Sequence, residues 1–161
     1  MKKITLLFVT LSLFACNDGN FDVPAFEFSD TINSCGNYIL YKTNSNKTEV
    51  LVLTINESNF KQEAGETTIS IGGATKVSYR IFNEGINSDY FCQDIPPFAP
   101  TVLKELIADE GSVIITASEI VSDNVISGYS YDINLTDLLL TNNDEKIYFE
   151  NYFFGTFEVN L

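Results

Sequence analysis

The amino-acid sequence predicts an all-β protein, an antiparallel β-sandwich of about nine or ten short strands. Three observations lead to this fold class. Short runs rich in β-branched and aromatic residues recur along the chain after residue 25. Turn-forming Gly, Asn and Asp separate most of these runs. Two runs alternate apolar with polar residues, as strands with one buried face do: Val77/Tyr79/Ile81 and Tyr129/Tyr131/Ile133.

The strand candidates follow one another down the chain. Residues 26–28 alternate, and the clearest strand is 49–56 (EVLVLTIN), which is apolar on both faces. Residues 101–108 also fit one face of a helix, but their short length favours a strand. The predicted strands are 38–41, 49–56, 67–71, 74–82, 101–108, 112–121, 125–135, 137–141, 146–150 and 152–159. Their arrangement stays open between an immunoglobulin-like and a jelly-roll-like sandwich.

Glycines and prolines mark the connections between these strands. Gly72-Gly73 predicts a hairpin turn, because such turns need positive φ angles. Asp109-Glu110-Gly111 predicts a second turn, between the strands on either side of it. Residues 83–100 form a long connection that contains three of the four prolines. Proline lacks the backbone N–H that donates hydrogen bonds between strands. No central strand is therefore expected to pass through this connection.

The first residues look like an export signal rather than part of the fold. Lys2 and Lys3 precede a mostly apolar run, 4–15, which is too short to span a bilayer and fits the helical core of a signal peptide. The run ends in LFAC (13–16), which resembles the lipobox of bacterial lipoproteins. That resemblance implies that Cys16 carries a diacylglycerol and that the chain is cut before it. The alternative is a core cysteine at the end of a buried helix.

Removing the signal peptide (1–15) makes the chain more acidic. The remaining 146 residues suit a lipidated cysteine with its linker (16–25) and a single sandwich domain (26–161). They keep all 22 acidic residues and seven of the nine basic ones, a formal net charge of −15. Such a surface repels nucleic-acid phosphates and anionic headgroups. No nucleic-acid partner is expected, and the domain should stand off the membrane.

The cysteine count predicts one disulfide. With lipid on Cys16, only Cys35 and Cys92 remain, and an exported protein meets an oxidising compartment. A Cys35–Cys92 bond would close a loop of about 57 residues and stabilise the fold by roughly 4 kcal/mol on the loop-entropy model. The alternative is two free buried thiols. Two cysteines without any histidine also argue against a zinc site.

The residue types leave little room for catalysis. The chain has no histidine, which excludes Ser-His-Asp and Cys-His nucleophile systems. Two acidic pairs remain, Asp109-Glu110 and Asp144-Glu145, but neighbours in a turn diverge into solvent instead of flanking a substrate. The oxygen-rich segments 132–137 and 142–145 lack EF-hand spacing, so turn formation is favoured over calcium binding. We expect no metal, no cofactor and no enzymatic activity.

Aromatic residues in the proline-bearing connection suggest a binding loop. Tyr90, Phe91 and Phe98 lie there, and aromatic rings on a rigid loop can stack on a sugar or dock a partner. The alternative, which we favour, is that they plug one end of the sandwich beside Cys92. The other aromatic residues, which crowd the C-terminal part of the chain, should mostly fill the core.

The chain resembles small lipoproteins of flavobacteria and their relatives in the Bacteroidota. The resemblance is carried by LFAC at 13–16, by Asp18 and Asp22, and by the segments SYRIFNEG, DYFCQDIPP and GYSYDINL. Asp30-Thr31-Ile32 also resembles the D-(S/T)-aliphatic motif that marks Thr31 as an O-glycosylation acceptor in this group. The resemblance implies an outer-membrane lipoprotein on the periplasmic face or the cell surface, and it brings no assigned activity.

These observations predict a lipid-anchored cell-envelope protein with a non-catalytic binding or structural role. Its partners would be the membrane, through the lipid on Cys16, and a glycan or an envelope protein. One alternative is a small carboxylate-dependent hydrolase that acts on envelope or extracellular glycan. Another is a calcium-stabilised adhesive or fimbrial subunit.

Overall fold

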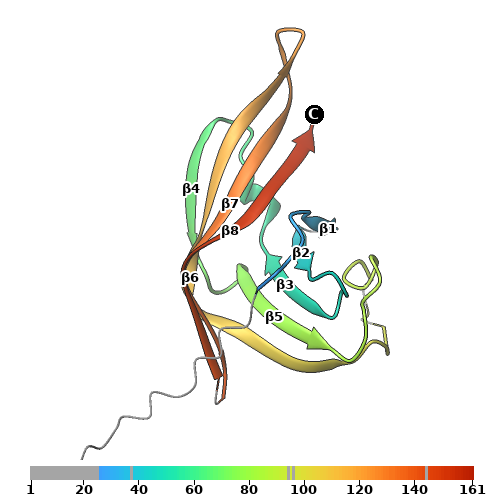
Figure 1. The fold of residues 1–161 in the computed structure, drawn as a ribbon. Coiled ribbons are helices and arrows are strands. Elements are labelled where there is room, and N and C mark those ends of the chain that lie inside the picture. Colours follow the sequence, from blue (N-terminus) through green and yellow to red (C-terminus); the bar gives the residue numbers. More distant parts are fainter. Residues whose placement is uncertain (1–25, 37, 94, 96, 144) are drawn as a thin grey trace, which may run out of the picture.

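In the computed structural model the chain forms one antiparallel sheet of eight strands that curls around a buried core (Figure 1). The structure describes residues 26–36, 38–93, 95, 97–143 and 145–161. The predicted signal helix, Cys16 and the linker up to residue 25 lie outside these ranges. The all-β class is confirmed, and the one helical turn in the described ranges is the 3-10 helix η1 (Glu57–Asn59). Among the same residues no helix is long and apolar enough to cross a bilayer.

The order of the strands in the sheet is nearly their order in the chain. The strands are β1 (Asn33–Cys35), β2 (Ile39–Thr43), β3 (Glu49–Thr54), β4 (Gly65–Ser70), β5 (Lys76–Phe82), β6 (Val102–Ser122), β7 (Val125–Asn142) and β8 (Glu145–Asn160). Neighbours run β1-β2-β3-β5-β6-β7-β8, and β4 pairs with β6. One half of β6, residues 102–107, pairs with β5, and the other, residues 112–117, pairs with β4. The long strands β6, β7 and β8 therefore connect the two ends of the molecule (Figure 1).

Three predicted strand pairs are in fact single long strands, which reduces the ten predicted strands to seven. The unpredicted β1 makes the total eight, rather than nine or ten. The turn predicted at 109–111 is a bend inside β6, where Gly111 has a φ of +136° and the register against β7 shifts on both sides. Asp137 in β7 (φ 51°) and Gly155 in β8 (φ 137°) hold similar positions. Positive φ angles serve β-bulges as well as turns, and bulges bend a strand without ending it. These bends let one sheet fold over its own core.

The two-glycine turn is present, but it does not make a hairpin. The Gly72 N–H donates to the Thr75 carbonyl (2.8 Å), and the Thr75 N–H donates back to the Gly72 carbonyl (3.1 Å). The strands on either side do not pair with each other, contrary to the prediction. β5 instead lies between β3 and β6, while β4 joins the distant half of β6.

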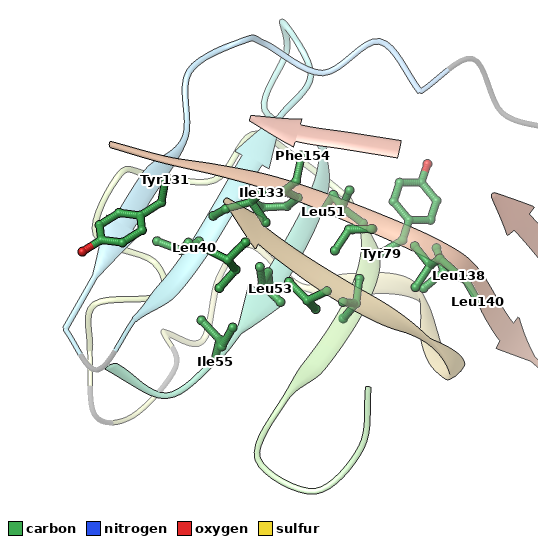
Figure 2. Close-up of a cluster of buried hydrophobic side chains, with 14 of the residues drawn as sticks. Leu40, Leu51, Leu53, Ile55, Tyr79, Tyr131, Ile133, Leu138, Leu140 and Phe154 are labelled. Atoms are coloured by element: carbon green, nitrogen blue, oxygen red, sulfur yellow. The ribbon is translucent and has the colours of Figure 1, made fainter. Parts of the chain in front are cut away.

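The main core fills the inside of the curl, as Figure 2 shows. Alternate side chains of β3 and β7 point inward, and Leu53, Ile133 and Leu135 are fully buried there. Tyr79 is buried at its edge and donates its hydroxyl to Oε2 of Glu49 (2.6 Å). Burial raises the pKa of Tyr79 above its ordinary value, and that hydrogen bond raises it further by a smaller amount. The largest fully buried side chains are Tyr79, Tyr131, Phe154, Leu40, Leu51, Leu53, Ile55, Leu106, Ile115, Ile133, Leu135 and Leu138.

Residues 26–32 bridge the two sides of the curl. The Ser29 N–H donates to the Thr43 carbonyl of β2 (2.9 Å). The Phe26 ring lies 4.8 Å from the Phe149 ring of β8, centroid to centroid. The segment is thus attached to β2 by its backbone and to β8 by side-chain packing.

Candidate functional site

The proline-bearing connection between β5 and β6, residues 83–101, packs against the outer face of β2 and β3. It contributes to a second hydrophobic cluster, whose buried members are Cys35, Tyr41, Val50, Val52, Phe82, Ile86 and Tyr90. Residues of β3 alternate between this cluster and the main core. Both faces of β3 are therefore buried, which confirms the prediction made from its doubly apolar pattern.

Hydrogen bonds fix the loop at its middle and at its two ends. The Tyr41 hydroxyl of β2 donates to the Ser88 carbonyl (2.7 Å). The Thr101 N–H donates to Oδ1 of Asn83 (2.8 Å), and the Asn83 N–H donates to the Thr101 carbonyl (3.1 Å). Burial, with a smaller effect of the Asp89 carboxylate, raises the pKa of Tyr41. The phenol therefore remains a hydrogen-bond donor well into the alkaline range.

The predicted disulfide is the third attachment of the loop. Cys35 of β1 and Cys92 of the loop are bonded, with their Cα atoms 4.9 Å apart. The bond joins residues 57 positions apart in the sequence. It ties Cys92, the central residue of the loop, to β1 at the edge of the sheet, four residues beyond Ser88.

The three aromatic residues predicted as one binding loop do not act as a unit. Tyr90 is buried, with its ring 5.0 Å from that of Phe82. Phe91 is half-buried, and the guanidinium carbon of Arg80 lies 5.8 Å from its ring centroid, a cation–π distance. Phe98 is 97% exposed. The expected plug beside Cys92 therefore describes Tyr90 and Phe91, whereas Phe98 remains available for a partner.

Other apolar side chains near Phe98 were not predicted from the sequence. Ile95 is 80% exposed in the same loop, and Val102 and Leu103 are exposed where β6 begins. Isoleucine and leucine carry no distinctive signal in a sequence. The two prolines between Ile95 and Phe98 are the available hint, since proline keeps apolar residues out of a regular strand. The apex of the loop is thus an exposed apolar surface on a fixed base.

Two ion pairs involve the strands that the loop joins, β5 and β6. Nε of Arg80 lies 2.6 Å from Oε1 of Glu105 on the neighbouring strand, and Lys104 pairs with Glu145 of β8. Arg80 thus both pairs with Glu105 and covers the Phe91 ring. These contacts position the base of the loop, and the exposed ion pairs themselves contribute little stability.

The remaining predicted residues lie elsewhere on the surface. Asp109 and Glu110 are exposed within β6, and Oδ2 of Asp109 accepts a hydrogen bond from the Thr141 hydroxyl (2.6 Å). Oδ1 of Asp132 accepts one from Thr156 (2.6 Å). Asp144 lies outside the described residues, and Thr31 is exposed. In the described part of the chain no three His, Cys, Asp or Glu side chains are grouped as a metal site requires.

Among the hollows lined by described residues, two are small and lie beside the sheet. One lies between β2 and the loop, lined among others by Tyr41 and Asn87, and the other lies beside β4, near Lys61 and Ile115. Each has a volume of about 40 Å³. That volume holds water and falls far below the roughly 300 Å³ of small-molecule pockets. Neither hollow suits a substrate of ordinary size.

Compared with known proteins, the chain matches no family model, no curated protein and no solved structure. The role of the loop is therefore inferred from the residues that it exposes. An apolar apex on a fixed base is chemically suited to docking, because it buries apolar area with little loss of conformational freedom.

Proposed function

We propose that this chain is a lipid-anchored cell-envelope protein that docks a neighbouring glycan or envelope protein through the apex of the loop, without catalysing a reaction. One observation carries the proposal: Phe98 is 97% exposed on a loop that a disulfide and the side-chain hydrogen bonds of Tyr41 and Asn83 hold in place. Burying such a side chain in a complex is worth roughly 1.5–3 kcal/mol. A preformed loop loses little of that gain to ordering.

The fold supports such a role as a scaffold. In this proposal the curled sheet serves as a sandwich-like body, with the main core between its two halves and the loop on its outside. The anchor rests on the lipobox-like LFAC at 13–16, and Cys16 would carry the lipid. Nine residues lie between Cys16 and Phe26, where the described fold begins. The location that follows is the outer membrane, on its periplasmic face or on the cell surface.

Changing Phe98 to serine is expected to weaken partner binding at least about tenfold, because an apolar contact worth more than about 1.4 kcal/mol is lost. Stability should stay the same, since the side chain is almost fully exposed. The full-length protein, extracted in detergent, would be applied to a glycan array and used in a pull-down from envelope extract. Ile107→Ser is the matched control, an exposed apolar residue of β6 outside the loop. The docking role would be refuted if the wild type bound nothing in either assay, or if Phe98→Ser bound as strongly as the wild type.

Changing Cys16 to alanine is expected to abolish incorporation of an alkyne fatty acid into the protein and to leave the uncleaved precursor. The reason is that the thiol of Cys16 is the proposed attachment point. In-gel fluorescence after click labelling measures the result, with Asn17→Ala as a control that keeps the thiol. Fatty-acid labelling that persists in Cys16→Ala would overturn the assignment.

A further inference from the structure

The hairpin that joins β6 to β7 projects beyond the rest of the sheet (Figure 1). Its two-residue turn, Asp123-Asn124, has positive φ angles of 53° and 61°, and Ser122 pairs with Val125 across it. The flanking strands stop short of it. The last pair of β8 with β7 is Gly128↔Asn160, and β4 pairs with β6 no further than Ala117. The tip, residues 121–126, therefore stands without lateral neighbours in the described sheet.

Three of the six residues of this unsupported tip are apolar and exposed. Val121, Val125 and Ile126 are between 39% and 65% exposed, and the adjacent Leu161, whose N–H donates to the Ser127 carbonyl, is 66% exposed. Val121 pairs with Ile126, which places these two on one face, while Val125 points to the other. A hairpin that only faces solvent needs no apolar residue on either side. Apolar residues on both faces instead fit a tip that is enclosed by something else.

The parts of β6, β7 and β8 next to the tip carry acidic side chains and no basic ones. The sequence has no Lys or Arg between Lys104 and Lys146, and none after Lys146. Asp123 sits at the turn, and the exposed carboxylates of Glu119 and Glu158 lie on the strands just below it. A surface that encloses the tip must therefore also neutralise negative charge.

We propose that the β6–β7 tip docks on an apolar surface of a protein partner, and that Lys or Arg side chains border this surface. The apolar surface covers Val121, Val125 and Ile126, and the cationic border pairs with Asp123 and Glu119. This inference is independent of the docking loop, because it rests on different residues at another part of the fold.

Two other occupants fit less well. Insertion into a bilayer would drive the Asp123 carboxylate in first, and a charge in hydrocarbon is costly. Pairing with the tip of a second copy would bring the same acidic groups together, and like charges across an interface oppose association. Charge complementarity thus selects a cationic protein surface.

The test uses the full chain, lipid-anchored in nanodiscs of neutral lipid. Its Val, Ile and Leu methyl groups are isotope-labelled, and their NMR signals are recorded as a synthetic amphipathic helix of Leu and Lys is added. We expect the helix to shift the methyl signals of Val121, Val125 and Ile126. A charge-reversed helix of Leu and Glu should bind at least about tenfold more weakly. Added salt should weaken the Leu/Lys binding, because the Asp123 and Glu119 pairs are exposed to screening.

Two variants and a matched control locate the contact. Val121→Ser with Val125→Ser should weaken binding about tenfold or more, and Asp123→Asn should weaken it several-fold at low salt only. Leu103→Ser with Ile107→Ser, exposed apolar residues in the other half of β6, should bind as the wild type does. Phe98→Ser should do so as well, which separates this site from the docking loop.

Three outcomes would overturn the proposal. The first is tip methyl signals that do not respond to the Leu/Lys helix. The second is tip signals that broaden on nanodiscs of neutral or anionic lipid without the helix, which assigns the tip to the membrane. The third is a sedimentation profile in which a dimer of the wild type is lost in the double valine variant, which assigns it to a second copy.

Discussion

Changing both Cys35 and Cys92 to serine is expected to lower the free energy of unfolding by about 4 kcal/mol. The disulfide joins residues 57 positions apart, and without it the unfolded chain regains the conformational freedom of that long loop. The loss is a large share of the 5–15 kcal/mol that typically holds a domain together. Urea unfolding followed by circular dichroism measures it. The loop would still keep its Tyr41–Ser88 hydrogen bond.

The control for this experiment is the wild-type protein with and without a reductant. Reduction should lower the midpoint of the wild type to that of the double variant and leave the variant unchanged. Equal midpoints for the reduced and oxidised wild type would show that the two thiols are free in the purified protein. A loss of unfolding free energy below about 1 kcal/mol would instead show that packing alone holds the loop closed.

Changing Gly111 to valine is expected to destabilise the fold by roughly 2–6 kcal/mol, from backbone strain and overpacking together. Its φ of +136° lies where residues with a side chain are strained. A Cβ atom there would lie 3.1 Å from the Leu138 Cα and 3.1 Å from the Thr136 carbonyl oxygen. Backbone atoms of β7 cannot move aside as a flexible side chain does. The same urea unfolding series measures the loss.

Gly72→Val provides a matched control for this change. Gly72 has the same φ of +136°, but a Cβ added to it meets nothing within 4 Å. Its replacement should cost the strain alone, about 1–3 kcal/mol. If both variants lose the same stability, the close approach of β6 to β7 at the bend contributes nothing and the strain explains the whole effect.

The buried strand and the disulfide could be predicted from the sequence because each depends on local composition. The run from 49 to 56 is apolar at every position that a two-sided strand would bury, and β3 is buried on both faces. If Cys16 carries the lipid, the two remaining cysteines leave one pairing. The bends could not be predicted, because Gly111 and Asp137 carry the same signal in a bulge as in a turn. Only the pairing of β6 with β7 on both sides of Gly111 distinguishes the two cases.

The aromatic residues of the loop show a second limit. Tyr90, Phe91 and Phe98 have similar side chains in one irregular segment, and no periodicity tells which of them faces the sheet. Tyr90 is buried because the backbone turns it towards Phe82, and Phe98 is exposed because the loop has by then left that surface. The exposed hairpin tip was missed for a related reason. How far β6 and β7 extend beyond β8 is a property of the register and not of either strand alone.

The attachment of residues 26–32 decides how the molecule would bear mechanical force. A pull on the N-terminal side of Phe26, the direction in which a lipid anchor would act, reaches the body through aromatic packing on Phe149 and the Ser29–Thr43 hydrogen bond. It does not load a ladder of backbone hydrogen bonds in shear. The segment would therefore peel away at low force and lengthen the tether while the eight-stranded sheet stays folded. If Cys16 anchors the chain as proposed, this segment would be the first part of the described structure to yield under such a pull.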